Sequence, residues 1–130
     1  MMEIPKPGTT VSTKDAIAIC NAHGKTDLAR RLQDNLDRLP AEWIFDGCSC
    51  WYQTWRGHPV YQVCFWHDVA YLIGGDEAMR LEADLELALG LVRMTRSVDF
   101  AEITLAGVRI GGAGAWRKNF SWGYGQKAAA

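Results

Sequence analysis

The sequence predicts an all-α fold in which two central helices pack antiparallel, with extra helices before them and an ordered, cysteine-containing loop. Three observations lead to this prediction. Apolar residues recur at helical spacing in several segments, Gly and Pro stand where those segments end, and residues 41–58 show neither the helical nor the strand period. At 130 residues the chain fits a single domain spanning 1–130.

The first residues predict an arm and then a short helix. Pro5, Pro7 and Gly8 indicate that residues 1–12 form an irregular arm. Ser12 or Thr13 can cap a helix running through residue 20, because their side-chain oxygens accept hydrogen bonds from backbone N–H groups of the first turn.

A second helix and an ordered loop are expected next. Thr26 can cap the helix, which continues until Pro40 interrupts it. Its apolar residues repeat at helical spacing: Leu28, Leu32, Leu36 and Leu39. Residues 41–58 are rich in Trp, Cys and Gly, and we expect them to form the ordered loop.

The two central helices have clear boundaries. Pro59 favours a helix start and Gly74-Gly75 a helix end, and the apolar stretch 60–73 between them predicts a helix buried nearly all round. Asp76 can cap a longer helix through about Thr95. We expect its buried stripe to contain Leu81, Leu85, Ala88 and Val92.

A last helix and a tail complete the prediction. After Ser97, apolar and small residues recur at roughly helical spacing and predict a short helix that ends at Gly111-Gly112, with an extended 108–110 segment as the alternative. The recurring residues are Phe100, Ile103, Gly107 and Ile110. Residues 113–130, with aromatic side chains among glycines and cations, predict an irregular tail.

Polar residues on the central helices suggest hydrolytic chemistry. Asp84 falls within the predicted buried stripe, and a buried carboxylate needs a partner. Antiparallel packing brings it toward His67, at a hydrogen-bond distance of about 3 Å. The carboxylate then fixes the imidazole tautomer, and the other ring nitrogen can take a proton from a water molecule that attacks an ester carbonyl.

A neighbouring acid suggests a cation site. Asp68 can bind a hard cation such as calcium together with backbone carbonyls of the preceding loop, which would polarise the carbonyl under attack. The candidate carbonyls belong to Phe45, Gly47, Ser49 and Trp51.

The composition limits the partners. Lys and Arg number 14 against 15 Asp and Glu, which provides no electrostatic footprint for nucleic acid. No run of about 18 apolar residues occurs. Six Trp suit either a core or a lipid–water boundary. The first residues lack a signal-peptide pattern, so the compartment stays open and secretion is consistent with the sequence if an export signal has been removed.

These residues resemble a known family. The string Cys64-Phe65-Trp66-His67-Asp68-Val69-Ala70-Tyr71 resembles the C-x-x-H-D-x-x-Y helix of the phospholipase A2 superfamily, and Ala83-Asp84 resembles the acid of its second long helix. Bacterial and viral members share the H-D-x-A-Y and A-D elements. Asp46-Gly47-Cys48-Ser49-Cys50 is similar to the Y-G-C-x-C calcium loop, so the resemblance covers residues 45–92.

The resemblance implies calcium-dependent hydrolysis of a glycerophospholipid sn-2 ester at a membrane surface. It makes His67 the base, Asp84 the acid that orients it, Tyr71 a donor to Asp84, and Asp68 the calcium ligand. It also implies a disulfide from Cys64 to Cys48 or Cys50, with Cys50 favoured. The family loop continues G-x-G-G where this chain has residues 51–54, Trp-Tyr-Gln-Thr, and we therefore expect weak calcium binding, in about the millimolar range.

Two other classes of function fit the same residues. Cys48-x-Cys50 and Cys64-x-x-His67 supply four ligands suitable for a structural zinc ion, although this leaves Asp68 and Asp84 unexplained. A noncatalytic helical interaction module with a degenerate calcium loop is the other alternative.

Overall fold

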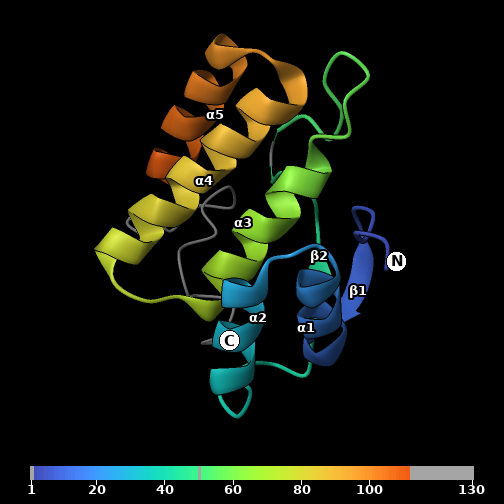
Figure 1. The fold of residues 1–130 in the computed structure, drawn as a ribbon. Coiled ribbons are helices and arrows are strands. Elements are labelled where there is room, and N and C mark those ends of the chain that lie inside the picture. The colour runs from blue at the N-terminus through green and yellow to red at the C-terminus, as the bar shows by residue number, and fades with distance from the viewer. Residues whose placement is uncertain (1, 50, 112–130) are drawn as a thin grey trace.

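The structure is a computed structural model that describes residues 2–49 and 51–111. In chain order its elements are β1 (Thr9–Ser12), α1 (Thr13–Ala22), α2 (Thr26–Asp34), β2 (Glu42–Phe45), α3 (Tyr61–Ile73), α4 (Glu77–Thr95) and α5 (Val98–Gly111) (Figure 1). The protein is mostly helical, but the all-α prediction is wrong, because two segments pair as a small antiparallel sheet.

The sheet joins two segments that were predicted to be irregular. Thr9 pairs with Phe45 and Ser12 pairs with Glu42, so β1 corrects the predicted arm 1–12 and β2 corrects the start of the predicted loop. In β2, the side chains of Trp43 and Phe45 are buried and those of Glu42 and Ile44 are exposed. An alternation over four residues is too short to identify from the sequence when turn-forming residues surround it.

The α1 helix begins as predicted, but Thr26 does not cap α2: it is the first residue of that helix, Lys25 holds the cap position, and no side chain caps it. Both helices end elsewhere than predicted. Ser12 caps α1, since its hydroxyl accepts a 3.0 Å hydrogen bond from the backbone N–H of Asp15. The helix continues two residues beyond the predicted end. The α2 helix ends at Asp34, well before Pro40, and turns follow it. Leucine spacing therefore overestimated the length of α2.

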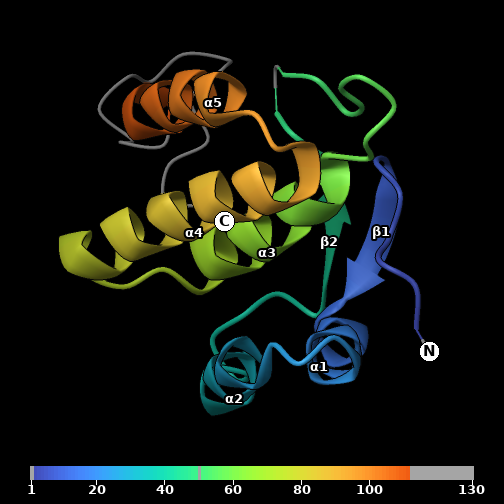
Figure 2. The ribbon, with the colours of Figure 1, turned by 45° about the horizontal axis from the view of Figure 1, so that its top comes forward.

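The central pair α3 and α4 matches the prediction in boundaries and direction. Gly74 ends α3 with a positive φ of 75°, and Asp76 caps α4 by accepting a 2.8 Å hydrogen bond from the backbone N–H of Met79. Because three residues connect them, the helices run antiparallel and lie side by side (Figure 2). This arrangement brings the middle of α3 against the first half of α4.

The buried face of α4 differs from the predicted stripe. Leu81 and Leu85 are 42% and 44% exposed, whereas the residues facing inward include Arg80, Asp84 and Leu87. Because Asp84 has polar partners inside the protein, α4 can bury this acid and leave Leu81 and Leu85 exposed. In α5, the predicted Ile103 and Ile110 are likewise exposed, and Phe100, Ala101, Thr104 and Val108 face the core.

The α5 helix extends from residue 98 to 111, so the extended alternative for residues 108–110 is wrong. The predicted tail, residues 113–130, lies outside the described residues. In the part of the chain that the structure describes, no helix has the length and apolar character needed to span a membrane.

Two apolar clusters flank α3 on opposite sides. The first joins Phe65 and Val69 of α3 to α1, α2 and the sheet. The second joins Val60 and Cys64 of α3 to α4 and α5. Because both faces of α3 pack against other elements, the polar side chain of His67 is buried at the centre of the domain.

Candidate functional site

His67 and Asp84 form a buried pair between α3 and α4. The His67 Nε2 atom lies 2.7 Å from Oδ1 of Asp84, and the two residues are 6% and 0% exposed. The prediction that they lie at hydrogen-bond distance is confirmed. Tyr71, one turn after His67, donates its hydroxyl to the same Oδ1 at 2.7 Å. The structure thus brings together all three residues predicted to be catalytic.

The pair determines which nitrogen of His67 carries the proton. A carboxylate can only accept, so Nε2 of the neutral imidazole donates to Asp84 and Nδ1 keeps its lone pair. Nδ1 has no hydrogen-bond partner among residues 2–49 and 51–111, and it is not sealed from solvent. His67 therefore offers an unoccupied basic nitrogen.

Two arginines, which the sequence analysis missed, contact Asp84 from the other side. Nη1 of Arg109 in α5 donates to Asp84 Oδ2 at 2.7 Å, and Nη1 of Arg80 lies 3.6 Å from the same oxygen. Arg80 precedes Asp84 by four residues, a spacing that places two residues on one helix face and is visible in the sequence. Arg109 comes from another helix, so no local pattern indicates it.

These contacts keep Asp84 ionised. Burial by itself raises the pKa of Asp84, but hydrogen bonds from His67, Tyr71 and Arg109 favour the carboxylate and bring the pKa below its ordinary value. Burial and the bond to Asp84 raise the pKa of Tyr71, so its hydroxyl keeps its proton and remains a donor. Asp84 therefore stays a fixed acceptor for His67 Nε2.

Glu77 completes the charged network. It accepts from Arg80 at 2.9 Å and from Arg109 at 2.6 Å, and these bonds lower its pKa to about 2. The two carboxylates and two guanidinium groups of the network balance in charge. Because Arg109 of α5 pairs with both Glu77 and Asp84, the network ties α5 to α4 beside His67.

An apolar cavity of about 240 Å³ adjoins the pair. Its polar lining includes His67, Asp68, Ser49 and Thr104, and its apolar lining comes from the loop, α4 and α5: Trp51, Leu87, Ile103, Val108 and Ile110. Ile103, 60% exposed, is one of several apolar residues at its mouth. The cavity suits a substrate with an apolar chain.

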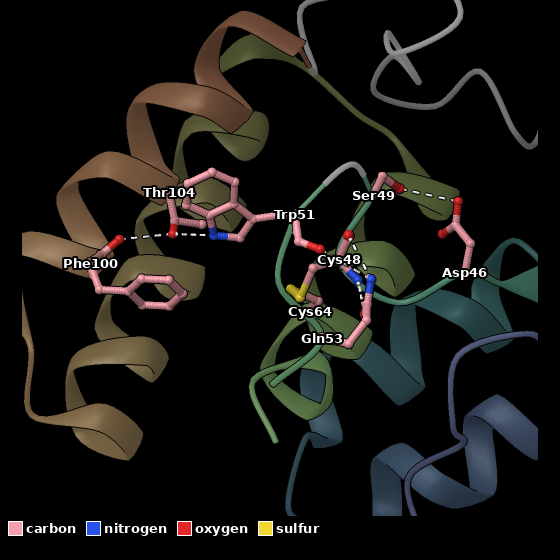
Figure 3. Close-up of a disulfide and its surroundings, with 8 residues drawn as sticks. All are labelled: Asp46, Cys48, Ser49, Trp51, Gln53, Cys64, Phe100 and Thr104. Atoms are coloured by element: carbon pink, nitrogen blue, oxygen red, sulfur yellow. Dashed lines mark hydrogen bonds between the residues drawn. A yellow bond between two sulfur atoms is a disulfide. The ribbon is translucent and has the colours of Figure 1, made fainter. Parts of the chain in front are cut away.

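A disulfide attaches the loop to the helix that bears His67. Cys48 is bonded to Cys64, one turn before His67 (Figure 3). The expected disulfide is present, but with Cys48 instead of the favoured Cys50, which lies outside the described residues. The sulfur atoms of a disulfide are not thiolates, so the predicted zinc site loses Cys48 and Cys64, two of its four ligands.

Cys20 is a free, buried cysteine, and burial raises the pKa of its thiol to about 12.

The described residues do not fit a resident calcium ion. Asp68 lines the cavity, as predicted, but Ca²⁺ takes six to eight oxygens. Of the candidate carbonyls, that of Phe45 accepts from the backbone N–H of Gly8 at 2.7 Å, and that of Trp51 accepts from the Gln53 side chain at 3.4 Å. No group of three or more His, Cys, Asp or Glu residues suited to a metal occurs in the described ranges.

Comparison with known proteins gives no relative. No protein-family model, curated protein or solved structure matches the chain. A functional assignment consequently depends on the geometry around His67.

Proposed function

We propose that the protein hydrolyses lipid esters with a water molecule activated by His67. The observation that carries the proposal is the buried pair itself: Nε2 of His67 is held by Asp84, whose pKa is lowered by its hydrogen-bond donors, and the His67 side chain also lines an apolar cavity. A His oriented in this way by a carboxylate is the arrangement that general-base catalysis requires.

The reaction balances without a covalent enzyme intermediate. His67 Nδ1 takes a proton from water as the water oxygen bonds to the ester carbonyl carbon. The resulting imidazolium then gives this proton to the departing alkoxide as the C–O bond breaks, which releases a fatty acid and an alcohol. Asp84 stabilises the imidazolium between these steps, and Tyr71 keeps Asp84 in position.

The negative charge on the carbonyl oxygen needs donors. Gly47 and Ser49 line the cavity together with His67, and their backbone N–H groups have no acceptor among the described residues. We assign the oxyanion contacts to these amides. Calcium is left out of the proposal, because two of the four candidate loop carbonyls, those of Phe45 and Trp51, accept hydrogen bonds from protein donors.

The apolar exposed rim favours a lipid substrate. Trp51 and Tyr52 of the loop and Ile103 and Ile110 of α5 are all exposed large apolar side chains, and three of them line the cavity. Such residues suit contact with a membrane surface, from which an acyl chain can enter. By its resemblance, the substrate is a glycerophospholipid and the bond is its sn-2 ester.

The experiment is an assay of fatty-acid release from mixed phospholipid vesicles that carry different acyl chains at sn-1 and sn-2. Wild type should release the sn-2 acid. His67→Gln, which keeps a polar side chain of similar length without a base, should lose at least about a thousandfold in kcat. The matched control is His58→Gln, a histidine of the loop outside the cavity, which should retain activity. Equal turnover by both variants would place the chemistry elsewhere.

One observation favours the noncatalytic interaction module as a second candidate. The two guanidinium groups beside Asp84 satisfy its charge, as in a structural salt-bridge network that holds α4 and α5 together. Under this alternative, wild type releases no fatty acid from any ester tested, while Asp84→Asn is strongly destabilised. The same assay and a thermal melt distinguish the two candidates.

A further inference from the structure

We infer that the Gln53 side chain holds the conformation of the cysteine-containing loop after β2 through its own hydrogen bonds. The stability of this loop and the rate of the proposed hydrolysis should then both be independent of calcium. The activity part of this inference rests on the proposed function, whereas the structural part does not. It departs from the resemblance, which implies that this loop binds calcium.

Both ends of the Gln53 amide are used inside the loop. Its Oε1 accepts from the backbone N–H of Cys48 at 2.8 Å, and its Nε2 donates to the Cys48 carbonyl at 3.0 Å (Figure 3). Nε2 also lies 3.4 Å from the Trp51 carbonyl. One side chain thus bridges both backbone groups of Cys48 and reaches a second residue of the loop.

The loop backbone is shaped to admit this amide. Gly47 has a φ of +81°, a conformation that glycine adopts readily and other residues rarely do. A Cβ atom added at Gly47 would lie 2.0 Å from Oε1 of Gln53. The space that a side chain would take at residue 47 is therefore taken by the Gln53 amide.

Two further anchors hold the same loop. The Cys48–Cys64 disulfide attaches it to α3. The Trp51 indole donates to the Thr104 hydroxyl at 2.9 Å and thereby attaches it to α5 (Figure 3). The loop is fixed at both sides of the cavity by groups of the chain itself.

The Gln53 amide also opposes cation binding. A loop cation needs free carbonyl oxygens, yet the candidate carbonyl of Trp51 and the neighbouring carbonyl of Cys48 both lie against Nε2 of Gln53. Amide hydrogens carry partial positive charge, so a cation at the same place would be repelled and would have to displace them.

The test compares thermal melting midpoints in about 5 mM calcium, above the millimolar affinities of weak sites, and in chelator. Wild type should melt at the same temperature in both. Gln53→Ala should melt about 4 °C lower in both, because Cys48 loses two hydrogen bonds. The matched control Gln33→Ala, on the exposed face of α2, should match wild type. A calcium-dependent rise in wild type, or an unchanged midpoint in Gln53→Ala, would overturn the inference.

An activity arm separates a positioning role from a merely structural one. Fatty-acid release by wild type should be the same in calcium and in chelator, and that of Gln53→Ala should fall about tenfold in kcat without recovery in calcium. Loss of wild-type release in chelator would overturn the inference and leave the hydrolase intact. No release in any condition, with melting indifferent to calcium, would refute the proposed function alone.

Discussion

Arg109 donates to Oδ2 of Asp84 at 2.7 Å, on the carboxylate oxygen opposite the one that bonds His67. The two oxygens therefore have separate partners, with His67 and Tyr71 on Oδ1 and the arginines on Oδ2. A carboxylate held at both oxygens cannot rotate about its Cβ–Cγ bond without losing a partner. The direction in which Asp84 holds the His67 ring thus depends on α5.

Removal of Arg109 should loosen this orientation. We expect Arg109→Gln to lower kcat by about tenfold with little change in KM, because the charged donor to Oδ2 is lost while the cavity remains. Arg109→Lys should recover part of the loss. Steady-state kinetics would show this, with Arg93→Gln, an exposed arginine of α4, as the control. If Arg93→Gln and Arg109→Gln have the same rates, Arg109 has no positioning role.

Stability should fall in acid through the carboxylates of the network. The pKa of Glu77 is lowered from 4.5 to about 2, and that of Asp84 is also lowered. A depressed folded-state pKa stabilises the fold above the unfolded pKa, and this contribution is lost as pH falls through the folded value. The free energy of unfolding should decrease from about pH 4.5 to pH 2.

Denaturant titrations at several pH values would measure this loss. Glu77→Gln should give a flatter profile over the same range, and the control Glu86→Gln, exposed on α4, should follow wild type. A profile of Glu77→Gln as steep as that of wild type would show that the network does not act through this acid.

The disulfide should contribute to both stability and activity. It closes a loop of sequence separation 16, for which chain entropy gives about 3 kcal/mol. Cys48→Ser combined with Cys64→Ser should lower the free energy of unfolding by about that amount and should lower turnover, because one wall of the cavity is released. Reductant should destabilise wild type and leave the double variant unchanged. Destabilisation of both by reductant would point to another bond.

The rim of the cavity should matter for vesicles more than for dispersed esters. Ile103→Glu adds a charge at the cavity mouth and should reduce vesicle hydrolysis about tenfold or more. A short-chain ester in solution should be affected much less. Ile44→Glu is a matched control, because Ile44 is 62% exposed on β2 and does not line the cavity. Equal losses on both substrates would argue against membrane contact through this rim.

The sequence was most informative where local signals agree. Asp76, Gly74 and the apolar run between residues 60 and 73 determine where α3 and α4 start and stop, since capping and chain reversal are local effects. A buried acid opposite a buried histidine then follows from the antiparallel arrangement. The His67–Asp84 bond could therefore be predicted before the structure.

Nonlocal contacts account for the errors. The pairing of β1 with β2 joins residues 30 to 36 positions apart, from Ser12 with Glu42 to Thr9 with Phe45, and each strand is too short to show a clear period. The buried face of α4 depends on Arg109 from α5, because this partner helps stabilise an inward Asp84 while Leu81 faces outward. Gln53 gave no motif, since its role depends on the folded shape of the loop.

The most direct test of the central claim is a double-mutant cycle on His67 and Asp84. kcat/KM would be measured on phospholipid vesicles for wild type, His67→Gln, Asp84→Asn and the double variant, with circular dichroism to confirm that each is folded. Residues that act as a unit are strongly non-additive. We predict that Asp84→Asn loses less than His67→Gln and that the double variant is no worse than His67→Gln alone. Losses that multiply in the double variant, or undiminished activity in His67→Gln, would contradict a catalytic His67–Asp84 pair.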